Sequence, residues 1–286
     1  MPDNYGKLYV VATPIGNLAD LTYRAVQILQ QVDLIAAEDT RHLQPLLQHY
    51  GIVNKLFALH QHNEAKASVD LVEKLRQGLS IALVSDAGTP LLSDPGLPLV
   101  KLAREQGIEV SPIPGACAVI AALSVSGLGL LPFCFEGFLP RTSSARQQFF
   151  TERQSLPMTW AFYESCHRIA ATLQDMAQIL PAERQIVIAR EMTKIHETIV
   201  KDRLDNLLAL VIQEPNMQRG EFVVIVEAAT ITIKPDQLTI EELKLLKILL
   251  SECSVKTASQ LAAQITGTKK QLFYQTALEL MAHKIE

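Results

Sequence analysis

Ionisable side chains gather in two short stretches of the sequence, each directly after an apolar run. Glu38, Asp39 and Arg41 form the first stretch, and His62 and Glu64 belong to the second. Carboxylates and imidazoles are the usual general acids and bases of enzymes, and a guanidinium pairs with phosphate or with developing negative charge. The two stretches therefore indicate a polar substrate whose proton must be moved, and these five residues are the predicted catalytic group.

These groups also have purely structural interpretations. Asp39 and Arg41 can form a solvated ion pair, which is usually worth only about 0–1 kcal/mol. His60, His62 and Glu64 have the spacing of partial metal ligands, but no fourth ligand follows at a recognisable spacing, so we predict no metal site. For the first stretch, both the catalytic and the ion-pair interpretation stay open.

A second kind of loop is rich in glycine and proline. Residues 13–17, 85–96 and 112–116 read TPIGN, SDAGTPLLSDPG and PIPGA, and each follows an apolar run. Glycine lacks a Cβ atom and proline fixes φ, so such loops can bring backbone N–H and C=O groups close to a ligand. We expect these loops to hold a cofactor and the charged loops to hold a substrate, although Asp86 can equally cap a turn.

The hydrophobic pattern supplies the elements that would bring these loops together. Strands are predicted from apolar runs at residues 7–12, 33–37, 56–59, 81–84 and 108–110. Helical periodicity fills the segments between them, and five such repeats predict a mostly parallel sheet with helices on both faces, an α/β fold. In such a sheet ligands bind at the carboxyl ends of the strands, where these loops lie.

The rest of the chain predicts a second α/β unit and a helical tail. The strands of this unit are predicted at residues 133–138, 159–163, 186–190, 197–200 and 221–226. Little helix separates the last three, which indicates a mixed sheet. Beyond a linker at 234–236, the tail resembles a helix-turn-helix, with helices at 239–251, 257–265 and 270–282. We predict an N-terminal α/β domain over 1–117, a C-terminal α/β domain over 118–233 and a helical tail over 234–286.

Composition narrows the class of protein. The chain has 286 residues, 48% of them hydrophobic, a net charge of −4 and four scattered cysteines. These values are typical of a reduced globular protein, and no signal peptide or membrane span is recognisable, so we expect a cytoplasmic location. The sequence lacks G-x-G-x-x-G, G-x-x-x-x-G-K-[ST] and G-x-S-x-G, which disfavours dehydrogenases, P-loop NTPases and α/β-hydrolases.

The order of the short motifs carries a family resemblance. Along residues 7–228 the chain reads TPIGNLADLT, AEDTR, HNE, SDAGTPLLSDPG, PGACA, EGFLPR, FYESCHR and REMTKIHE. Together these motifs resemble the 16S ribosomal RNA cytidine 2′-O-methyltransferases of the tetrapyrrole methylase superfamily. The resemblance implies two α/β domains that bind S-adenosylmethionine in the cleft between them, usually within a homodimer. It also implies methyl transfer to the ribose 2′-oxygen of a cytidine in the ribosomal decoding centre.

The resemblance implies a set of cofactor contacts but no particular catalytic base. The contacts that it implies are Pro14, Gly16, Asp86, Ala87, Gly88, Pro90, Ala116, Cys117, Ala118, Phe162, Tyr163, Gly220 and Glu221. Superfamily members that act on tetrapyrroles have a GGD-type sequence where this chain has Val84-Ser85-Asp86. This departure favours the RNA-modifying branch.

The net charge limits how RNA can be bound. A charge of −4 gives no support to general binding of polyanions, so phosphate contacts must be few and local. We expect RNA contacts at Arg141, Arg146, Arg168, Lys194, Lys269 and Lys270. The expected partner is 16S ribosomal RNA within the 30S subunit, recognised largely by shape. Two alternatives stay open: a methyltransferase acting on a tetrapyrrole precursor, and, less favoured, a non-catalytic ligand-sensing regulator.

Overall fold

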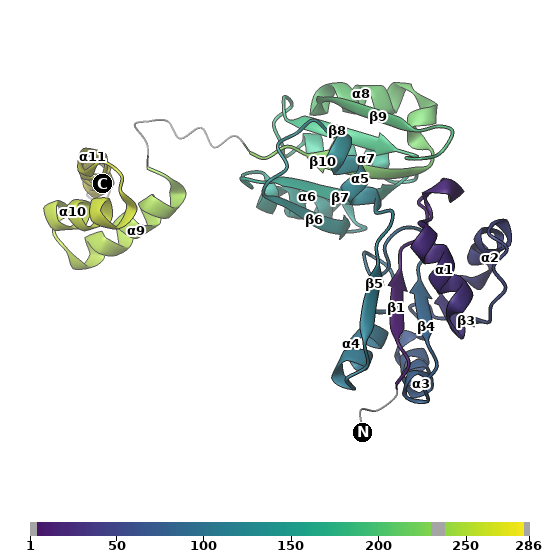
Figure 1. The fold of residues 1–286 in the computed structure, drawn as a ribbon. Helices are drawn as coiled ribbons and strands as arrows, with labels where there is room; N and C mark the ends of the chain where they lie inside the picture. Colours follow the sequence, from purple (N-terminus) through teal and green to yellow (C-terminus); the bar gives the residue numbers. More distant parts are fainter. Residues whose placement is uncertain (1–4, 230–237, 283–286) are drawn as a thin grey trace. The chain divides into compact units, whose positions relative to one another are not determined.

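The computed structural model describes residues 5–229 and 238–282, which belong to two compact units, Met1–Ala229 and Thr230–Glu286 (Figure 1). The first unit holds two β-sheets with their helices, and the second unit holds three helices. The predicted linker at 234–236 and the predicted boundary after residue 233 lie outside the described residues. The predicted boundary after residue 117 lies between the last strand of the first sheet and the next helix.

The first sheet consists of five parallel strands in the order β3-β2-β4-β1-β5. The strands are β1 (Leu8–Val11), β2 (Leu34–Ala37), β3 (Leu56–Ala58), β4 (Ile81–Val84) and β5 (Val110–Ile113). β2 and β4 are buried at every position, which explains why they read as continuous apolar runs. The predicted parallel sheet is confirmed.

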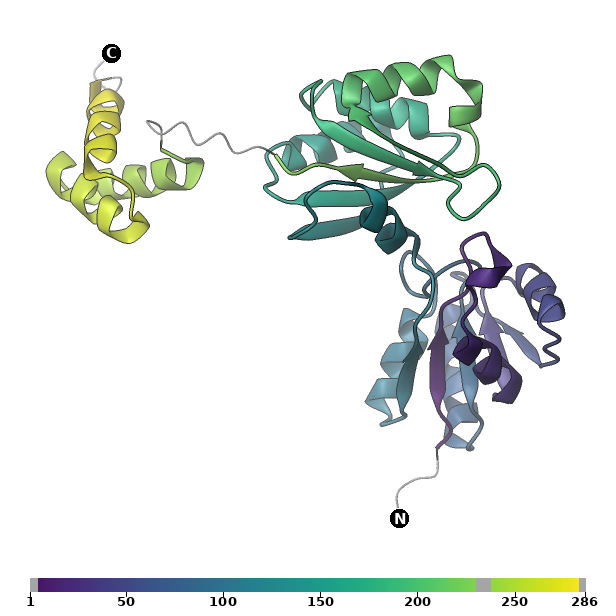
Figure 2. The same ribbon diagram turned by 45° about the horizontal axis from the view of Figure 1, so that its top comes forward.

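Helices cover both faces of this sheet, as Figures 1 and 2 show. The helices are α1 (Tyr23–Gln31), α2 (Thr40–His49), α3 (Glu64–Arg76) and α4 (Leu97–Glu105). On one face, α1 and α2 contribute Leu29 and Leu46 to a buried cluster; on the other, α3 and α4 contribute Leu71 and Leu99. The carboxyl ends of all five strands therefore meet at one edge.

Strand β5 lies slightly later than predicted. The strand was predicted at residues 108–110, just before the proline- and glycine-rich loop at 112–116. The strand nevertheless continues to Ile113, with Pro112 opposite Val10 of β1. β5 is one of the two edge strands of the sheet, and an edge tolerates proline because one side of the strand needs no partner.

The second sheet is mixed, as predicted, with the order β6-β7-β10-β8-β9. Its strands are β6 (Phe133–Phe138), β7 (Thr159–Ser165), β8 (Gln185–Arg190), β9 (Thr198–Arg203) and β10 (Glu221–Val226). β6 and β7 are parallel, and the other neighbouring pairs are antiparallel. Three helices pack on one face, α6 (Ser143–Arg153), α7 (Ile169–Ala177) and α8 (Leu204–Gln213), while α5 (Ala118–Val125) packs on the other.

The second unit is a small helical bundle of α9 (Ile240–Glu252), α10 (Val255–Thr266) and α11 (Lys270–Ala282). Thr239 and Glu242 form a capping box at the start of α9, and Gly267 ends α10 with φ +77°. Its own core includes Leu246 and Phe273, both fully buried. The three predicted tail helices are confirmed. In the described parts of both units, no helix has the length and apolar character needed to cross a membrane.

Candidate active site

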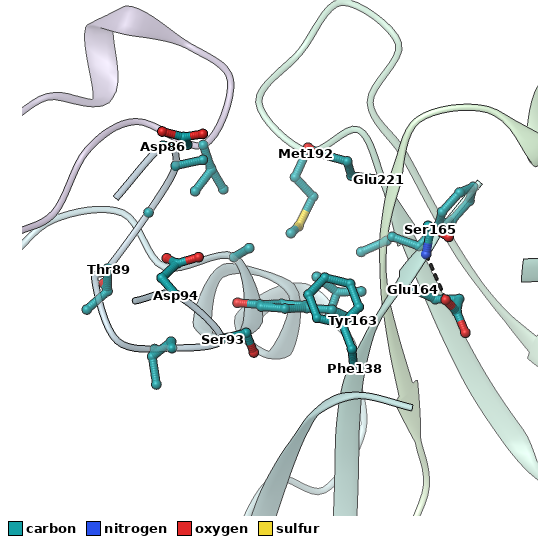
Figure 3. Close-up of a pocket in the computed structure, with 18 of the residues that line it drawn as sticks. Asp86, Thr89, Ser93, Asp94, Phe138, Tyr163, Glu164, Ser165, Met192 and Glu221 are labelled. Carbon is teal, nitrogen blue, oxygen red and sulfur yellow. Dashed lines mark hydrogen bonds between the residues drawn. The ribbon is translucent and has the colours of Figure 1, made fainter. Parts of the chain in front are cut away.

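A cavity of about 400 Å³, here called the main cavity, lies at the carboxyl edge of the first sheet and against the second sheet. Figure 3 shows that Asp86, Thr89 and Asp94 line it from the loop after β4, and that Phe138 and Tyr163 line it from β6 and β7. The aromatic rings of Phe138 and Tyr163 meet edge to face, 5.6 Å apart. This size and mixed lining are typical of a site for a small molecule.

The loop after β4 is held in an uncommon backbone conformation. Gly88 has φ +83°, donates its N–H to the Thr13 carbonyl at 3.1 Å, and accepts the Thr13 N–H at 2.9 Å. A Cβ atom on Gly88 would lie only 3.2 Å from Ile15 Cγ2. Leu91 and Ser93 also have positive φ values, 75° and 74°, which side-chain-bearing residues rarely adopt. Such backbone strain is concentrated at functional sites.

Six acidic residues line the main cavity, and Lys194 or Arg168 pairs with three of them, Glu164, Glu191 and Glu221. The other three are Glu38, Asp86 and Asp94. Burial, followed by repulsion from Asp86 and Asp94, raises the pKa of Glu38 to about 6. Burial also raises the pKa of Asp94 and brings that of the Tyr163 phenol to about 12. Carboxylates that repel one another in a partly buried site attract a cation, so the main cavity suits a positively charged ligand.

Asp86 links the loop after β4 to the start of α2. Its Oδ1 accepts the backbone N–H of Asp39 at 3.0 Å, and its Oδ2 lies 3.0 Å from His42 Nδ1. The hydrogen bond to Asp86 raises the pKa of His42 above its ordinary value. A single carboxylate thus positions both the first residue before α2 and an imidazole on its first turn.

The carboxylate of Asp39 forms an ion pair with Arg41. Its side chain caps α2 by accepting the Arg41 N–H, and it binds the guanidinium with contacts of 3.0 and 2.6 Å. These hydrogen bonds hold the pKa of Asp39 well below its ordinary range. The side chain of Arg41 remains 87% exposed and can still contact a phosphate.

A second cavity, of about 260 Å³, adjoins the main cavity. The residues that line both cavities are Ile15, Asp86, Ala87, Lys194 and Glu221. The loop after β1 adds Pro14 and Gly16 to the second cavity, and α2 adds His42 and Pro45. Two ligands bound in these two cavities would therefore be direct neighbours.

Lys194 holds part of the shared wall in place. Its Nζ contacts Glu191 Oε1 at 2.8 Å and Glu221 Oε2 at 2.9 Å. Gly16 leaves room for this side chain, since a Cβ atom there would lie 2.5 Å from Lys194 Cγ. Gly220, with φ +90°, similarly leaves room for Glu191, whose Cγ would lie 2.4 Å from an added Cβ atom. Gly16 thus allows the loop after β1 to approach a loop of the second sheet, and Gly220 allows two loops of the second sheet to approach each other.

The structure brings only part of the predicted cofactor set to the main cavity. The residues that line it are Asp86, Ala87, Gly88, Ala118, Tyr163 and Glu221. Pro14 and Gly16 line the second cavity instead, and Pro90, Ala116, Cys117, Phe162 and Gly220 line neither. Ala116 supports the loop indirectly, because its carbonyl accepts the Thr89 hydroxyl at 3.0 Å.

The position of the Phe162 side chain corrects one prediction. Phe162 is fully buried in the core beneath α6, α7 and α8, stacked on Trp160 at 5.6 Å. Successive side chains of a strand point to opposite faces of the sheet, so Tyr163 faces the cavity and Phe162 cannot. A side-chain contact from Phe162 to a ligand in the main cavity is therefore ruled out in this structure.

The predicted catalytic group is also divided by the structure. Glu38 lines the main cavity, whereas Asp39, Arg41, His62 and Glu64 line neither cavity. Glu64 Oε2 accepts the backbone N–H of Gly96 at 3.0 Å and so fastens the far end of the loop after β4. His62 is exposed. No cluster of three potential metal ligands occurs in residues 5–229 and 238–282.

Sequence reasoning missed several lining residues, including His42, Asp94, Phe138 and Met192. His42 directly follows the predicted stretch that ends at Arg41, and Asp94 belongs to the quoted loop motif. Both were therefore within reach of a wider reading of the motifs. Met192 belongs to the quoted motif REMTKIHE, but nothing local in the sequence shows that this loop approaches the first sheet.

The predicted RNA contacts have very different surroundings. The prediction that Arg146 contacts RNA is wrong in this structure. Its guanidinium is buried, binds Asp175 with contacts of 2.8 and 2.6 Å, and donates to the Arg141 carbonyl at 2.8 Å. It faces the core side of α6 and cannot reach RNA without unfolding. Arg168 donates to the carbonyls of Leu139 and Pro140.

The other predicted RNA contacts differ in solvent exposure and in ion pairing within the protein. Lys194 is paired with two glutamates, as described above. Arg141 in the first unit, and Lys269 and Lys270 in the second unit, are exposed at their own surfaces. These three residues remain suitable for contacts with phosphate.

Comparison with known proteins shows the family to which this fold belongs. Residues 7–208 match a family model described as Tetrapyrrole (Corrin/Porphyrin) Methylases, and residues 236–281 match one described as RsmI C-terminal HTH domain. The chain belongs to the tetrapyrrole methylase family. The predicted α/β fold class and the predicted enzyme class, an S-adenosylmethionine-dependent methyltransferase, are confirmed.

Curated relatives within this family share about half of their residues with the chain. The ribosomal RNA small subunit methyltransferase I of Haemophilus influenzae is 51% identical over 97% of this chain and 98% of its own length. The protein of the same name from Escherichia coli O157:H7 is 50% identical over 97% of this chain and 96% of its own length.

Solved structures of the family share the fold at low sequence identity. The methyltransferase CobJ matches with a TM-score of 0.59 and 19% identity, over 78% of this chain and 95% of its own. A uroporphyrin-III C-methyltransferase from Thermus thermophilus, complexed with S-adenosylhomocysteine, matches with a TM-score of 0.53 and 15% identity, over 78% and 97% of the two chains.

The main cavity fits S-adenosylmethionine by the chemistry of its lining. Glu38, Asp86 and Asp94 match a sulfonium, which is positively charged. Ile15 and Met192 supply apolar surface, as a site for a drug-sized molecule requires. At Gly88 the absent Cβ lets the loop after β4 pack closely against Ile15.

Proposed function

We propose that the protein transfers the methyl group of S-adenosylmethionine to the ribose 2′-oxygen of a cytidine in 16S ribosomal RNA. The observation that supports this proposal most is the pair of adjoining cavities, of which the main one is lined by Glu38, Asp86 and Asp94 among its acidic residues. The ribosomal substrate is supported by about 50% identity to ribosomal RNA small subunit methyltransferases over 97% of the chain. The choice of the 2′-oxygen of a cytidine in the decoding centre rests on the eight ordered motifs.

In this proposal the donor occupies the main cavity. S-adenosylmethionine supplies an already activated methyl group on its sulfonium. Glu38, Asp86 and Asp94 would hold the positive charge, and the Phe138 and Tyr163 rings would cover the site and exclude water. The main task left to the chain is to align donor and acceptor, which alone can supply about 7–11 kcal/mol of the barrier.

The chain must also activate the acceptor hydroxyl and hold the RNA in place. A ribose hydroxyl is a weak nucleophile until its proton is accepted, and the RNA backbone must be held close to the cavities. Two exposed arginines are suited to phosphate: Arg41 on the first turn of α2, with 87% of its side chain exposed, and Arg141 in the loop before α6. We propose these two residues, with Lys269 and Lys270 of the second unit, as the RNA contacts.

We also propose that the protein works as a homodimer on the 30S subunit in the cytoplasm. Large apolar side chains are exposed on α5 and around β6, including Ile120, Val125, Leu131 and Phe138, with exposed fractions of 52–90%. Exposed apolar patches often mark protein–protein interfaces. Analytical ultracentrifugation of the purified chain tests the dimer, and a Leu131→Glu variant is expected to shift it toward monomer.

The decisive experiment compares 16S ribosomal RNA from cells with and without the gene by mapping 2′-O-methyl groups. We expect one cytidine in the decoding centre to lose its methyl group and to regain it in vitro when the protein, labelled S-adenosylmethionine and the unmodified 30S subunits are combined. Transfer of the label to a tetrapyrrole precursor instead, with the RNA unlabelled, would overturn the proposal.

A further inference from the structure

The second cavity contains an imidazole whose orientation is fixed. His42 lies on the first turn of α2 and lines this cavity, and its side chain is 70% exposed. Its Nδ1 is 3.0 Å from Asp86 Oδ2, and Asp86 is in turn held by the backbone N–H of Asp39. An ionised carboxylate only accepts hydrogen bonds, so Nδ1 carries a proton. In the neutral ring, Nε2 is then left with a lone pair.

We propose that the second cavity binds the acceptor nucleoside and that His42 Nε2 accepts the proton of its 2′-hydroxyl, with Asp86 as the positioning residue. This inference rests on the proposed function and names the catalytic base of the same reaction. The acceptor and donor would then be neighbours, because five residues line both cavities.

The other candidates for the base have different tasks in this structure. Asp39 is bound twice by the Arg41 guanidinium, which makes its carboxylate a weak base. Glu64 accepts the Gly96 N–H, and Glu38 lines the main cavity but not the second one. Asp86 and Glu221 also line the second cavity, but Asp86 holds the Asp39 N–H and the His42 ring, and Glu221 pairs with Lys194 at 2.9 Å. The geometry therefore favours His42 as the proton acceptor on the acceptor side.

The step balances as a nucleophilic substitution. The hydroxyl proton moves to Nε2, an oxygen lone pair forms the new O–C bond, and the S–C bonding pair stays on sulfur, which becomes a neutral thioether. His42 becomes an imidazolium, which the Asp86 carboxylate stabilises across the 3.0 Å contact. The imidazolium later loses its proton to water, so no further reactant is needed.

The charges that face His42 come from several elements. Asp86 follows β4, Asp39 and Arg41 stand at the start of α2, and Lys194 and Glu221 line the same cavity. The hydrogen bond to Asp86 is the largest cause of the raised pKa of His42. The base is therefore protonated at low pH, and the rate should rise with pH until the imidazole is neutral.

The first test needs no donor. In the full-length protein without ligand, nitrogen-detected NMR of His42 should show the Nδ1–H tautomer and a pKa above the ordinary 6.5. Asp86→Asn should lower that pKa and leave the signals of His49, on the last turn of α2, unchanged. An Nε2–H tautomer in the wild-type protein would overturn the proposed role of His42.

The second test uses His42→Asn, whose amide can keep the hydrogen bond to Asp86 but has no nitrogen in the position of Nε2. With saturating 30S subunits and labelled donor, the single-turnover rate should fall about 10²- to 10⁴-fold, while donor affinity by calorimetry stays within about twofold. His42→Gln should be equally slow, and the matched control His49→Asn should react at the wild-type rate.

The pH profile separates a base from a structural residue. The wild-type rate should follow the His42 pKa measured by NMR, and this dependence should vanish in His42→Asn. A His42→Asn rate within about threefold of wild type, or a wild-type profile without that pKa, would overturn the inference but leave the proposed function intact. Failure of the wild-type protein to label 16S ribosomal RNA would instead contradict the proposed function itself.

Discussion

Asp86 illustrates how much one side chain does in this site. It lines both cavities, accepts the Asp39 N–H, and lies 3.0 Å from the His42 imidazole. Its sequence context, a glycine- and proline-rich loop after a buried strand, predicts a loop that approaches a ligand, and the family resemblance implies Asp86 as a cofactor contact. Its partner on α2 was not predictable, because nothing local in the sequence brings residues 42 and 86 together.

Glu38 should make donor binding depend on pH. Its pKa of about 6 means that the carboxyl is neutral below that pH and anionic above it, with Asp86, Asp94, Asp39 and His42 as the neighbouring charges. A bound sulfonium favours the anion, so affinity should rise about 3- to 10-fold between pH 5 and pH 7, with proton release.

Calorimetry of donor binding in buffers with different ionisation enthalpies measures both the affinity and the released protons. Glu38→Gln should bind with much less dependence on pH over this range. An equally strong rise of affinity in Glu38→Gln would show that another group is responsible.

Asp39 and Arg41 should serve the acceptor and not the donor. Neither side chain lines the main cavity, and Arg41 is held in an exposed position by its contacts with Asp39. Arg41→Ala and Asp39→Asn should therefore lower kcat/KM for 30S subunits by about 10- to 100-fold, the loss expected for one charge-assisted contact. Calorimetric donor affinity should change little, and a loss of donor binding would reassign this loop to the donor site.

At the scale of elements, most strands and helices were predictable from hydrophobic periodicity. Buried strands such as β2 and β4 are short apolar runs, and the tail helices carry clear caps such as Thr239 and Gly267. The order of strands in each sheet was not predictable, because pairing between distant strands depends on packing that no local pattern records. The two cavities result from that pairing, so their lining was only partly foreseen.

The mistaken placement of Arg146 has the same origin. Its neighbours in sequence are polar, but α6 turns it toward Asp175 of α7, where both side chains are at most 7% exposed. Arg146→Ala leaves the Asp175 charge buried without its partner and should lower the free energy of unfolding by about 3–5 kcal/mol. The double variant Arg146→Met, Asp175→Leu should recover most of that loss.

Urea unfolding followed by circular dichroism measures both variants of this pair. Arg141→Ala, on the exposed loop next to α6, is the matched control and should unfold like the wild-type protein. A stable Arg146→Ala variant with weakened RNA binding would return Arg146 to the RNA surface.

At the scale of the whole molecule, donor binding should belong to the first unit alone. Every residue that lines either cavity lies between Thr13 and Val223, within Met1–Ala229. A chain ending at Ala229 should therefore bind the donor within about twofold of the full-length affinity by calorimetry. Its methylation of 30S subunits should be weaker, since Lys269 and Lys270 are removed. Lost donor binding in the shortened chain would contradict this division of roles.

The sparse positive charge should appear as a shallow salt dependence of RNA binding. With a net charge of −4, the proposed phosphate contacts are the exposed Arg41, Arg141, Lys269 and Lys270. At about 0.7 per contact, the logarithm of the association constant should fall with the logarithm of salt concentration with a slope of about −3. Filter binding across a salt series measures this slope, and a value near −8 would require a much larger basic surface.

The carboxylates of the main cavity have a consequence for turnover. Glu38, Asp86 and Asp94 attract the sulfonium, but the thioether left after each reaction has lost that positive charge. The spent molecule is therefore held less tightly than the fresh one, and exchange between them runs in the productive direction. The loss of charge at sulfur therefore favours release of the by-product from this carboxylate group.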